Sequence, residues 1–258
     1  MCTEYCILHM CWALLPRIPN PPSPSPANQH HTTDQPPSSI NPQDHQPPST
    51  LHLGVLLFPG FQSLDVFGPL DCLNILSWDP TTNPTLTLSL ISTTLSPVPT
   101  RPPHLPTAIS QSILPTHTLT TAPPLDVLLI PGGWGTRAPL PEYIEYIRTV
   151  YPALKYLLTV CTGARLAARA GVLDGKRATT NKLDWEGVVR QAPNVTWVRE
   201  ARWVVDGKVW SSAGVSAGID LCLDWVEHIW GVEVAGKVER IVEFRRWREG
   251  GRDPFVVG

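Results

Sequence analysis

The chain has 258 residues, and 11 of its 29 prolines fall within the first 50 residues. Residues 51–258 contain 19 lysines and arginines and 19 aspartates and glutamates, so this part of the chain carries no net charge. That balance argues against a protein that binds nucleic acid or a membrane surface through a basic patch. We therefore expect neither nucleic acid nor a membrane among the partners of this protein.

Residues 1–50 are predicted to form a disordered, proline-rich leader. Between Asn20 and Ser49 almost every residue is Pro, Ser, Gln, Asn, His or Thr, and such a segment cannot bury enough apolar surface to offset the entropy lost on ordering. The apolar run Cys6–Leu15 is too short to span a bilayer. The charge before it is Glu4 rather than the Lys or Arg of a secretory signal. We expect a cytoplasmic protein with one domain, at residues 51–258.

Strands and helices are predicted to alternate along this domain. The apolar run Leu53–Phe58 ends at Pro59-Gly60 and is typical of a buried parallel strand. Further strands are predicted at Leu86–Ser92, Asp126–Ile130, Tyr156–Val160, Val195–Arg199, Trp203–Val205 and Lys208–Ser211, with short edge strands and loops in Ser96–Pro124. Helices are predicted at Leu64–Leu76, Pro141–Thr149, Thr162–Ala170, Gly214–Trp230 and Val234–Phe244. The alternation predicts an α/β fold with helices on both faces of a mostly parallel sheet, whose ligands bind at the carboxyl ends of the strands.

Two groups of polar side chains near the end of the chain are expected to face solvent. Apolar residues recur at spacings of three and four in the predicted helix Gly214–Trp230, which leaves the opposite side polar. The residues expected on that side are Ser216, Asp220, Asp224 and Glu227. The second group is Arg245, Arg246 and Arg248, interpreted as a solvated surface. Because few residues follow the last predicted helix, we expect no helix-turn-helix domain of a transcriptional regulator.

Cys161 is the candidate nucleophile. In Val160-Cys161-Thr162-Gly163 it lies between a predicted strand and a predicted helix, as the serine does in a nucleophile elbow. The N–H groups at the start of the helix would lower the pKa of its thiol. The alternative is a buried, inert cysteine, which is the interpretation we favour for Cys72 and Cys222 because both lie within helical patterns.

Two other segments follow predicted strands and bear on the same site. Backbone N–H groups of Gly132 and Gly133 could stabilise an anion beside the cysteine, although Pro131–Gly135 also suits an ordinary tight turn. Asp65 could cap its own helix. Alternatively, its carboxyl faces the thiol and shares a proton with it, which would raise the pKa of the carboxyl.

Seven motifs occur in order and at regular spacing between Leu51 and Phe255: Gly54–Gly60, Leu64-Asp65, Gly68-Pro69, Ile130–Gly133, Val160–Gly163, Gly175–Thr180 and Gly214–Asp220. Together they resemble the DJ-1/PfpI superfamily, and most closely its isonitrile hydratase branch. The resemblance implies a flavodoxin-like sandwich, similar to class I glutamine amidotransferases, that forms a homodimer and uses no metal or organic cofactor. It also implies that Cys161 is the nucleophile, Asp65 its carboxyl partner and Thr162 an assisting hydroxyl.

The residues predicted to bind substrate or stabilise an anion around this group are Gly132, Gly133, Trp134 and Asn181. Two positions depart from related branches. Thr162 replaces the histidine that follows the cysteine in peptidase-like members, and Asn181-Lys182 replaces the His-Trp pair of many hydratase-like members. Asn181 can form hydrogen bonds but cannot take a proton.

Three functions remain open for a small electrophilic substrate. The first is a cofactor-independent enzyme that adds water to an isonitrile. The second is a glyoxalase-type conversion of a 2-oxoaldehyde. The third is a redox-sensing or protective protein in which Cys161 is oxidised.

Overall fold

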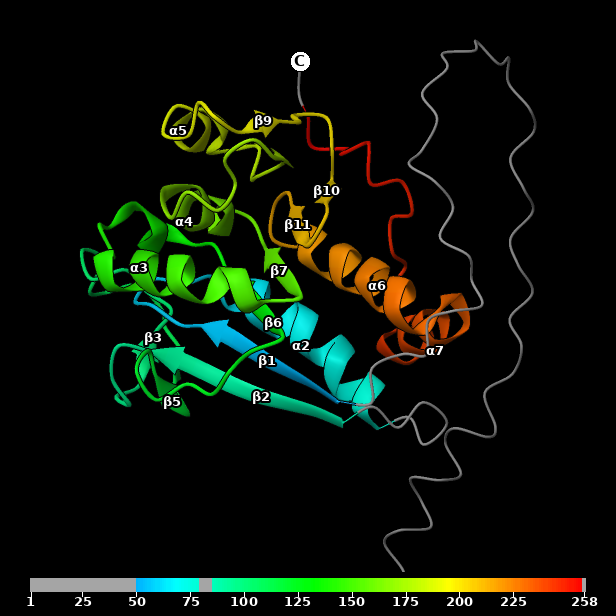
Figure 1. Cartoon of the computed structure of the whole chain (residues 1–258), viewed down its shortest axis with the longest axis horizontal. Helices are drawn as coiled ribbons and strands as arrows, with labels where there is room; N and C mark the ends of the chain where they lie inside the picture. The colour runs from blue at the N-terminus through cyan, green and yellow to red at the C-terminus, as the bar shows by residue number, and fades with distance from the viewer. Residues whose placement is uncertain (1–49, 79–84, 257–258) are drawn as a thin grey trace, which may run out of the picture. The chain divides into compact units, whose positions relative to one another are not determined.

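The computed structural model describes residues 50–78 and 85–256. The predicted leader, apart from Thr50, lies outside these residues. Within them, seven strands form one sheet in the order β10-β11-β7-β6-β1-β2-β5 (Figure 1). Their bounds are Thr50–Leu56 (β1), Thr85–Ser92 (β2), His117–Thr118 (β5), Val127–Ile130 (β6), Tyr156–Thr159 (β7), Trp203–Asp206 (β10) and Val209–Ser212 (β11). All neighbouring pairs are parallel except the hairpin β10–β11, so the mostly parallel sheet is confirmed.

Two further pairs of short strands lie outside the main sheet. β3 (Val98–Pro99) pairs with β4 (Ser112–Ile113) in the region where edge strands were expected. β8 (Arg177–Ala178) pairs with β9 (Thr196–Trp197). The strand predicted at Val195–Arg199 is therefore shorter than expected and belongs to a separate sheet.

Helices cover both faces of the main sheet (Figure 1). Helices α2 (Ser63–Ser77), α6 (Ala217–Trp230) and α7 (Val232–Val242) pack together on one face, and α3 (Pro141–Val150) packs with α4 (Gly163–Arg169) on the other. The short helices are α5 (Trp185–Val189), η1 (Trp134–Arg137) and η2 (Tyr151–Ala153). None of the helices in the described residues is long and apolar enough to cross a membrane.

The turns that follow three central strands lie together at the carboxyl ends of those strands. β6 is buried along its whole length, as its sequence Val-Leu-Leu-Ile predicts, and it lies between β1 and β7. Helix α4 begins directly against β6, because a Cβ on Gly163 would lie only 2.2 Å from the carbonyl oxygen of Ile130. Glycine is thus required there, and the close approach brings the turns after β1, β6 and β7 together.

The two groups expected to face solvent include two buried residues. Asp220 is fully buried, since its Oδ2 accepts a hydrogen bond from Nε of Arg202 (2.7 Å) and its Oδ1 accepts one from the N–H of Trp247 (2.7 Å). Arg246 is also buried and pairs with Glu227 and Glu239. The expectation was wrong for Asp220 and Arg246, because the segment after α7 folds back over α6 and covers part of its polar side, whereas Arg245 and Arg248 are exposed as expected.

Candidate active site

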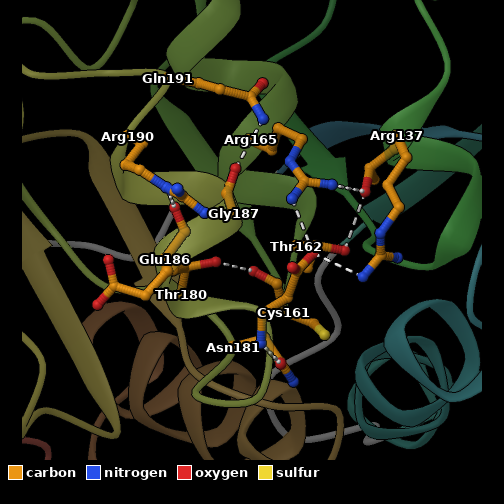
Figure 2. Close-up of polar contacts among 12 residues, drawn as sticks. Arg137, Cys161, Thr162, Arg165, Thr180, Asn181, Glu186, Gly187, Arg190 and Gln191 are labelled. Carbon is orange, nitrogen blue, oxygen red and sulfur yellow. Dashed lines mark hydrogen bonds and ion pairs between the residues drawn. The ribbon is translucent and has the colours of Figure 1, made fainter.

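Cys161 occupies a strained turn between β7 and α4. Its φ of 57° lies in the left-handed region, which a residue with a side chain adopts at a cost of about 1–2 kcal/mol. Two hydrogen bonds hold the turn: the N–H of Cys161 donates to Ala213 O (2.9 Å), and Thr180 Oγ1 donates to Cys161 O (2.9 Å; Figure 2). This backbone has the geometry predicted for a nucleophile elbow. Strain maintained by surrounding contacts is a feature of functional sites.

Asp65 belongs to α2 but does not cap it. The residue at the N-cap is Gln62, and no side chain bonds to the free N–H groups of this helix end. Instead, Asp65 Oδ2 accepts a hydrogen bond from the N–H of Gly132 (2.8 Å), while its buried Oδ1 has no hydrogen-bond partner among the described residues. Burial raises the pKa of the Asp65 carboxyl to about 7, and the hydrogen bond from Gly132 offsets only part of that effect. This carboxyl is therefore poised to exchange a proton near neutral pH.

The thiol of Cys161 is not acidified, contrary to the expectation from its place at a helix start. Burial raises its pKa to about 12, and the charge of Asp65 acts in the same direction. Hydrogen bonds from the N–H of Thr162, from the Asn181 side chain and from the Thr162 hydroxyl lower the pKa but do not outweigh burial. The expectation was wrong because only 6% of Cys161 is exposed, so a thiolate there loses most of its hydration. At pH 7 the thiol of Cys161 is therefore neutral, and the carboxyl of Asp65 is about half ionised.

The glycine turn after β6 organises the two groups. The N–H of Gly132 binds Asp65, and the N–H of Gly133 donates to Thr162 Oγ1 (3.0 Å). A Cβ on Gly132 would lie 2.7 Å from Thr162 Oγ1 and 2.9 Å from Asp65 Oδ2, so this position sits between the two side chains. Both N–H groups are engaged by side chains of the site, and their predicted contact with a developing anion stays a prediction.

The remaining predicted residues fall in different places. Asn181 lies beside the nucleophile, since its side chain bonds to the sulfur of Cys161 and its Oδ1 accepts the N–H of Asp184 (3.0 Å). Trp134 lies on the surface with 55% of the residue exposed, and the guanidinium of Arg137 is 4.2 Å from the centre of its ring. The structure therefore brings together Cys161, Asp65, Thr162 and Asn181. A role for Trp134 in substrate binding stays a prediction.

The sequence did not predict an ion pair behind these residues between the buried Arg165 and the half-buried Asp184. Arg165 of α4 is 3% exposed, and its Nη2 lies 2.7 Å from Asp184 Oδ2 (Figure 2). Its Nη1 also donates to Thr136 Oγ1 (3.4 Å), which donates in turn to Thr162 Oγ1 (3.1 Å). The pair thus links the loop of Asn181 to the turn of Thr162. No pattern in the sequence marks it, because its two members lie 19 residues apart in different elements.

A cavity of about 490 Å³ opens beside Asn181. Its walls are residues 181–183, Arg199, Arg202, residues 214–216, Asp253 and Phe255. Asn181 thus contacts both the sulfur of Cys161 and the cavity. Among the described residues, no group of three or more His, Cys, Asp or Glu side chains is arranged to hold a metal ion.

Comparison with known proteins matches residues 53–228 to the DJ-1/PfpI family. The chain belongs to this family. It is 34% identical over 199 residues to isonitrile hydratase from Pseudomonas putida, a match that covers 75% of this chain and 78% of that protein. It is 32% identical over 117 residues to the HTH-type transcriptional regulator CdhR from Pseudomonas aeruginosa, of which the match covers 34%. The family thus includes relatives of more than one function.

Solved structures agree with the expected fold. A ThiJ/PfpI family protein from Pseudomonas syringae superposes with a TM-score of 0.62 at 24% identity, covering 82% of this chain and 83% of that one. DJ-1beta from Drosophila melanogaster gives a TM-score of 0.62 at 20% identity and covers 76% of this chain and 99% of that one. The resemblance inferred from the seven motifs and the flavodoxin-like architecture are both confirmed.

Proposed function

We propose that this protein is an enzyme that hydrates isonitriles to N-substituted formamides, with Cys161 as nucleophile and Asp65 as the group that moves protons. The observation that carries the proposal is the unpartnered, buried oxygen of Asp65 on a carboxyl whose pKa is about 7. The carboxyl adjoins a cysteine held in a strained turn. The 34% identity to an isonitrile hydratase over most of the chain supports the choice of substrate class.

The first step joins sulfur to carbon. The sulfur of Cys161 attacks the terminal carbon of the isonitrile R–NC while the ionised Asp65 takes the thiol proton. Asp65 then delivers this proton to the same carbon, which gives the thioimidate R–N=CH–S–Cys161. Because the carboxyl is about half ionised at pH 7, the thiol does not need a low pKa of its own.

The second step uses water and regenerates the thiol. Asp65 takes a proton from water as the oxygen adds to the thioimidate carbon, and it passes this proton to the nitrogen. The carbon–sulfur bond then breaks, its electron pair returns to sulfur, and the hydroxyl proton reaches sulfur through Asp65. The product is R–NH–CHO, and the enzyme returns to its starting state with one water consumed.

Hydrogen bonds to the sulfur complete the arrangement. The N–H of Thr162 and the Asn181 side chain both bond to Cys161, and they favour sulfur when it carries negative charge. Asn181 therefore occupies a position that is histidine in many hydratase-like relatives. It forms hydrogen bonds there but does not act as a base. All proton transfers in this mechanism pass through Asp65.

The test combines product analysis with the intact mass of the protein. We expect purified full-length protein to convert benzyl isocyanide to N-benzylformamide and to carry a transient adduct on Cys161. Parallel incubations with methylglyoxal and with hydrogen peroxide separate the alternatives. Lactate formed from methylglyoxal without any formamide would instead support the glyoxalase-type reaction, and stable oxidation of Cys161 with no turnover would support the redox-sensing protein.

A further inference from the structure

The cavity beside Asn181 is placed to receive the part of the substrate that does not react. Gly214 lines it, and a Cβ at that position would lie 3.2 Å from Nδ2 of Asn181. The preceding residue, Ala213, accepts the N–H of Cys161. Two of the lining residues, Asn181 and Gly214, are therefore in contact with the nucleophile or next in sequence to a residue that is. A volume of about 490 Å³ is far larger than an isonitrile group needs and falls in the range of ligand-binding pockets.

Part of the cavity wall lies outside the segment that matches the family. Asp253 and Phe255 line the cavity, whereas the DJ-1/PfpI match ends at residue 228. The segment that carries them is held by backbone hydrogen bonds: the N–H of Arg202 donates to Gly250 O (2.7 Å), and the N–H of Asp253 donates to Glu200 O (2.6 Å). The wall of the cavity therefore combines residues inside the family match with residues of a segment that follows it.

Two of the three cations in the wall are already neutralised. Nη2 of Arg202 lies 2.6 Å from Asp220 Oδ2, and its Nη1 lies 3.6 Å from Asp253 Oδ1. The ammonium of Lys182 donates to Thr179 Oγ1 (2.8 Å) and Ala201 O (2.7 Å), and it lies 3.8 Å from Asp253 Oδ2. These side chains are at most 8% exposed and form a closed network. Neither cation needs a ligand.

Arg199 is the third cation, and its charge is the least compensated. Its Nη1 lies 3.8 Å from Glu186 Oε1, and the two side chains are 42% and 68% exposed, so this ion pair is weak. The guanidinium also lies 5.7 Å from the centre of the ring of buried Trp185, a cation–π contact that favours this placement of the charge. A guanidinium held in this way presents two N–H groups that match the two oxygens of a carboxylate.

The rest of the wall includes apolar side chains that are open to solvent. Leu183 is 97% exposed and Phe255 is 66% exposed, and both line the cavity together with Val215. Large apolar side chains gathered at a cavity favour a ligand with an apolar body. The cavity thus combines one available cation with apolar surface.

We infer that the cavity is a specificity subsite for an anionic substituent: the substrates are isonitriles whose apolar body carries a carboxylate, and Arg199 binds that carboxylate. The inference rests on the proposed function for the reaction but concerns a separate group of residues. The corresponding products are N-formyl amino acids with apolar side chains. Arg199 is then a substrate-binding residue that contributes to affinity and takes no part in the proton transfers.

The test measures binding without turnover. Calorimetry compares N-formylphenylalanine with its methyl ester on the full-length protein. We expect the acid to bind about 10-fold more tightly, the effect of one charge-assisted hydrogen bond. Arg199→Gln should remove this preference while the affinity for the ester changes by less than about 2-fold. Arg245→Gln, which removes an exposed arginine that does not line the cavity, should retain the preference.

Kinetics with the matching isonitriles, 2-isocyano-3-phenylpropanoate and its methyl ester, separates this inference from the proposed reaction. Arg199-dependent binding of the acid with no hydration of either isonitrile would support the subsite and refute the reaction. Hydration of both isonitriles at equal kcat/KM, unchanged in Arg199→Gln, would refute the subsite and leave the reaction standing. The subsite is also refuted if neither formamide binds or if the preference for the acid survives in Arg199→Gln.

Discussion

Two regions of the molecule, called corners below, each contain a buried cysteine and a buried aspartate. At the elbow the charge of Asp65 acts on Cys161, whereas on α6 Asp220 and Cys222 face different neighbours. At the elbow, Asp65 has one backbone hydrogen bond and an oxygen without a partner, and Cys161 has a strained backbone. On α6, both oxygens of Asp220 are bonded, and Cys222 lies in regular helix with its thiol against Pro69 O (3.5 Å). Burial is common to both corners, so it does not distinguish the corner proposed to be catalytic. The unsatisfied oxygen and the strained turn do.

The largest difference between the corners should appear when each cysteine is changed. We expect Cys161→Ser to lower turnover by at least about 10⁴-fold, because a buried hydroxyl is a far weaker nucleophile than the thiol. Cys222→Ser is the matched control. Its hydroxyl can still donate to Pro69 O, and turnover should stay within about 2-fold of the original because packing is nearly conserved. Equal losses in the two variants, measured by formamide production, would remove the distinction between the corners.

The aspartate on α6 should be the more important one for stability. Asp220→Asn leaves the charge of Arg202 with only the more distant Asp253 (3.6 Å). Breaking one side of a buried ion pair destabilises the folded state by about 3 kcal/mol or more. Urea unfolding at pH 7 measures this free energy directly. A variant as stable as the original would show that Asp253 alone compensates the guanidinium.

The aspartate at the elbow should show the opposite effect on stability. Burial raises the pKa of Asp65 from 3.8 to about 7, so its favourable contribution is complete below the unfolded pKa and is lost as the pH rises through 7. The shift is worth up to about 4 kcal/mol, and an unpaired amide N–H in Asp65→Asn reduces the gain to about 2 kcal/mol. We therefore expect Asp65→Asn to be about 2 kcal/mol more stable than the original at pH 8 and about 1–2 kcal/mol less stable at pH 4, where the cost of the unpaired amide remains but the carboxyl is neutral.

Urea unfolding curves at pH 4 and pH 8 measure the difference in stability between Asp65→Asn and the original protein and thus test its sign. A loss of stability in Asp65→Asn at pH 8 would mean that the folded protein stabilises the carboxylate of Asp65, contrary to its raised pKa. In that case Asp65 and Asp220 would both stabilise the folded protein, and the contrast between the two corners would be lost.

Much of the fold follows from local sequence. The apolar run Val127–Ile130, followed by Pro131-Gly132-Gly133, predicts a buried strand and its end, and both are found. The hairpin β10–β11 likewise follows from Asp206-Gly207, a dipeptide typical of two-residue hairpin turns. Helix α5, with five residues, was not predicted because it is too short to show a helical period. Asp220 was assigned to solvent because its contacts come from residues 202 and 247, which no local pattern reveals.

The candidate site was predictable in outline. The turn at Cys161 and the placement of Asp65 near it were expected from strand ends and from the family motifs, and the structure contains both; their catalytic partnership stays a prediction. The direction of the thiol pKa was wrong, because helix-end geometry is local whereas desolvation depends on how the whole chain packs around the sulfur. The Arg165–Asp184 pair and the cavity wall at Phe255 depend on tertiary contacts alone.

The central claim is that Asp65 moves protons for Cys161, and the pH dependence of kcat/KM for isonitrile hydration tests it most directly. The wild-type protein should gain activity about 10-fold per pH unit below 7 and level off above it, because the ionised carboxyl is the active form. Asp65→Asn should be about 10²–10⁴-fold slower and show no inflection near pH 7. An inflection near pH 8.5, the value of a free thiol, in both proteins at similar rates would contradict the claim, because Cys161 would then react without Asp65.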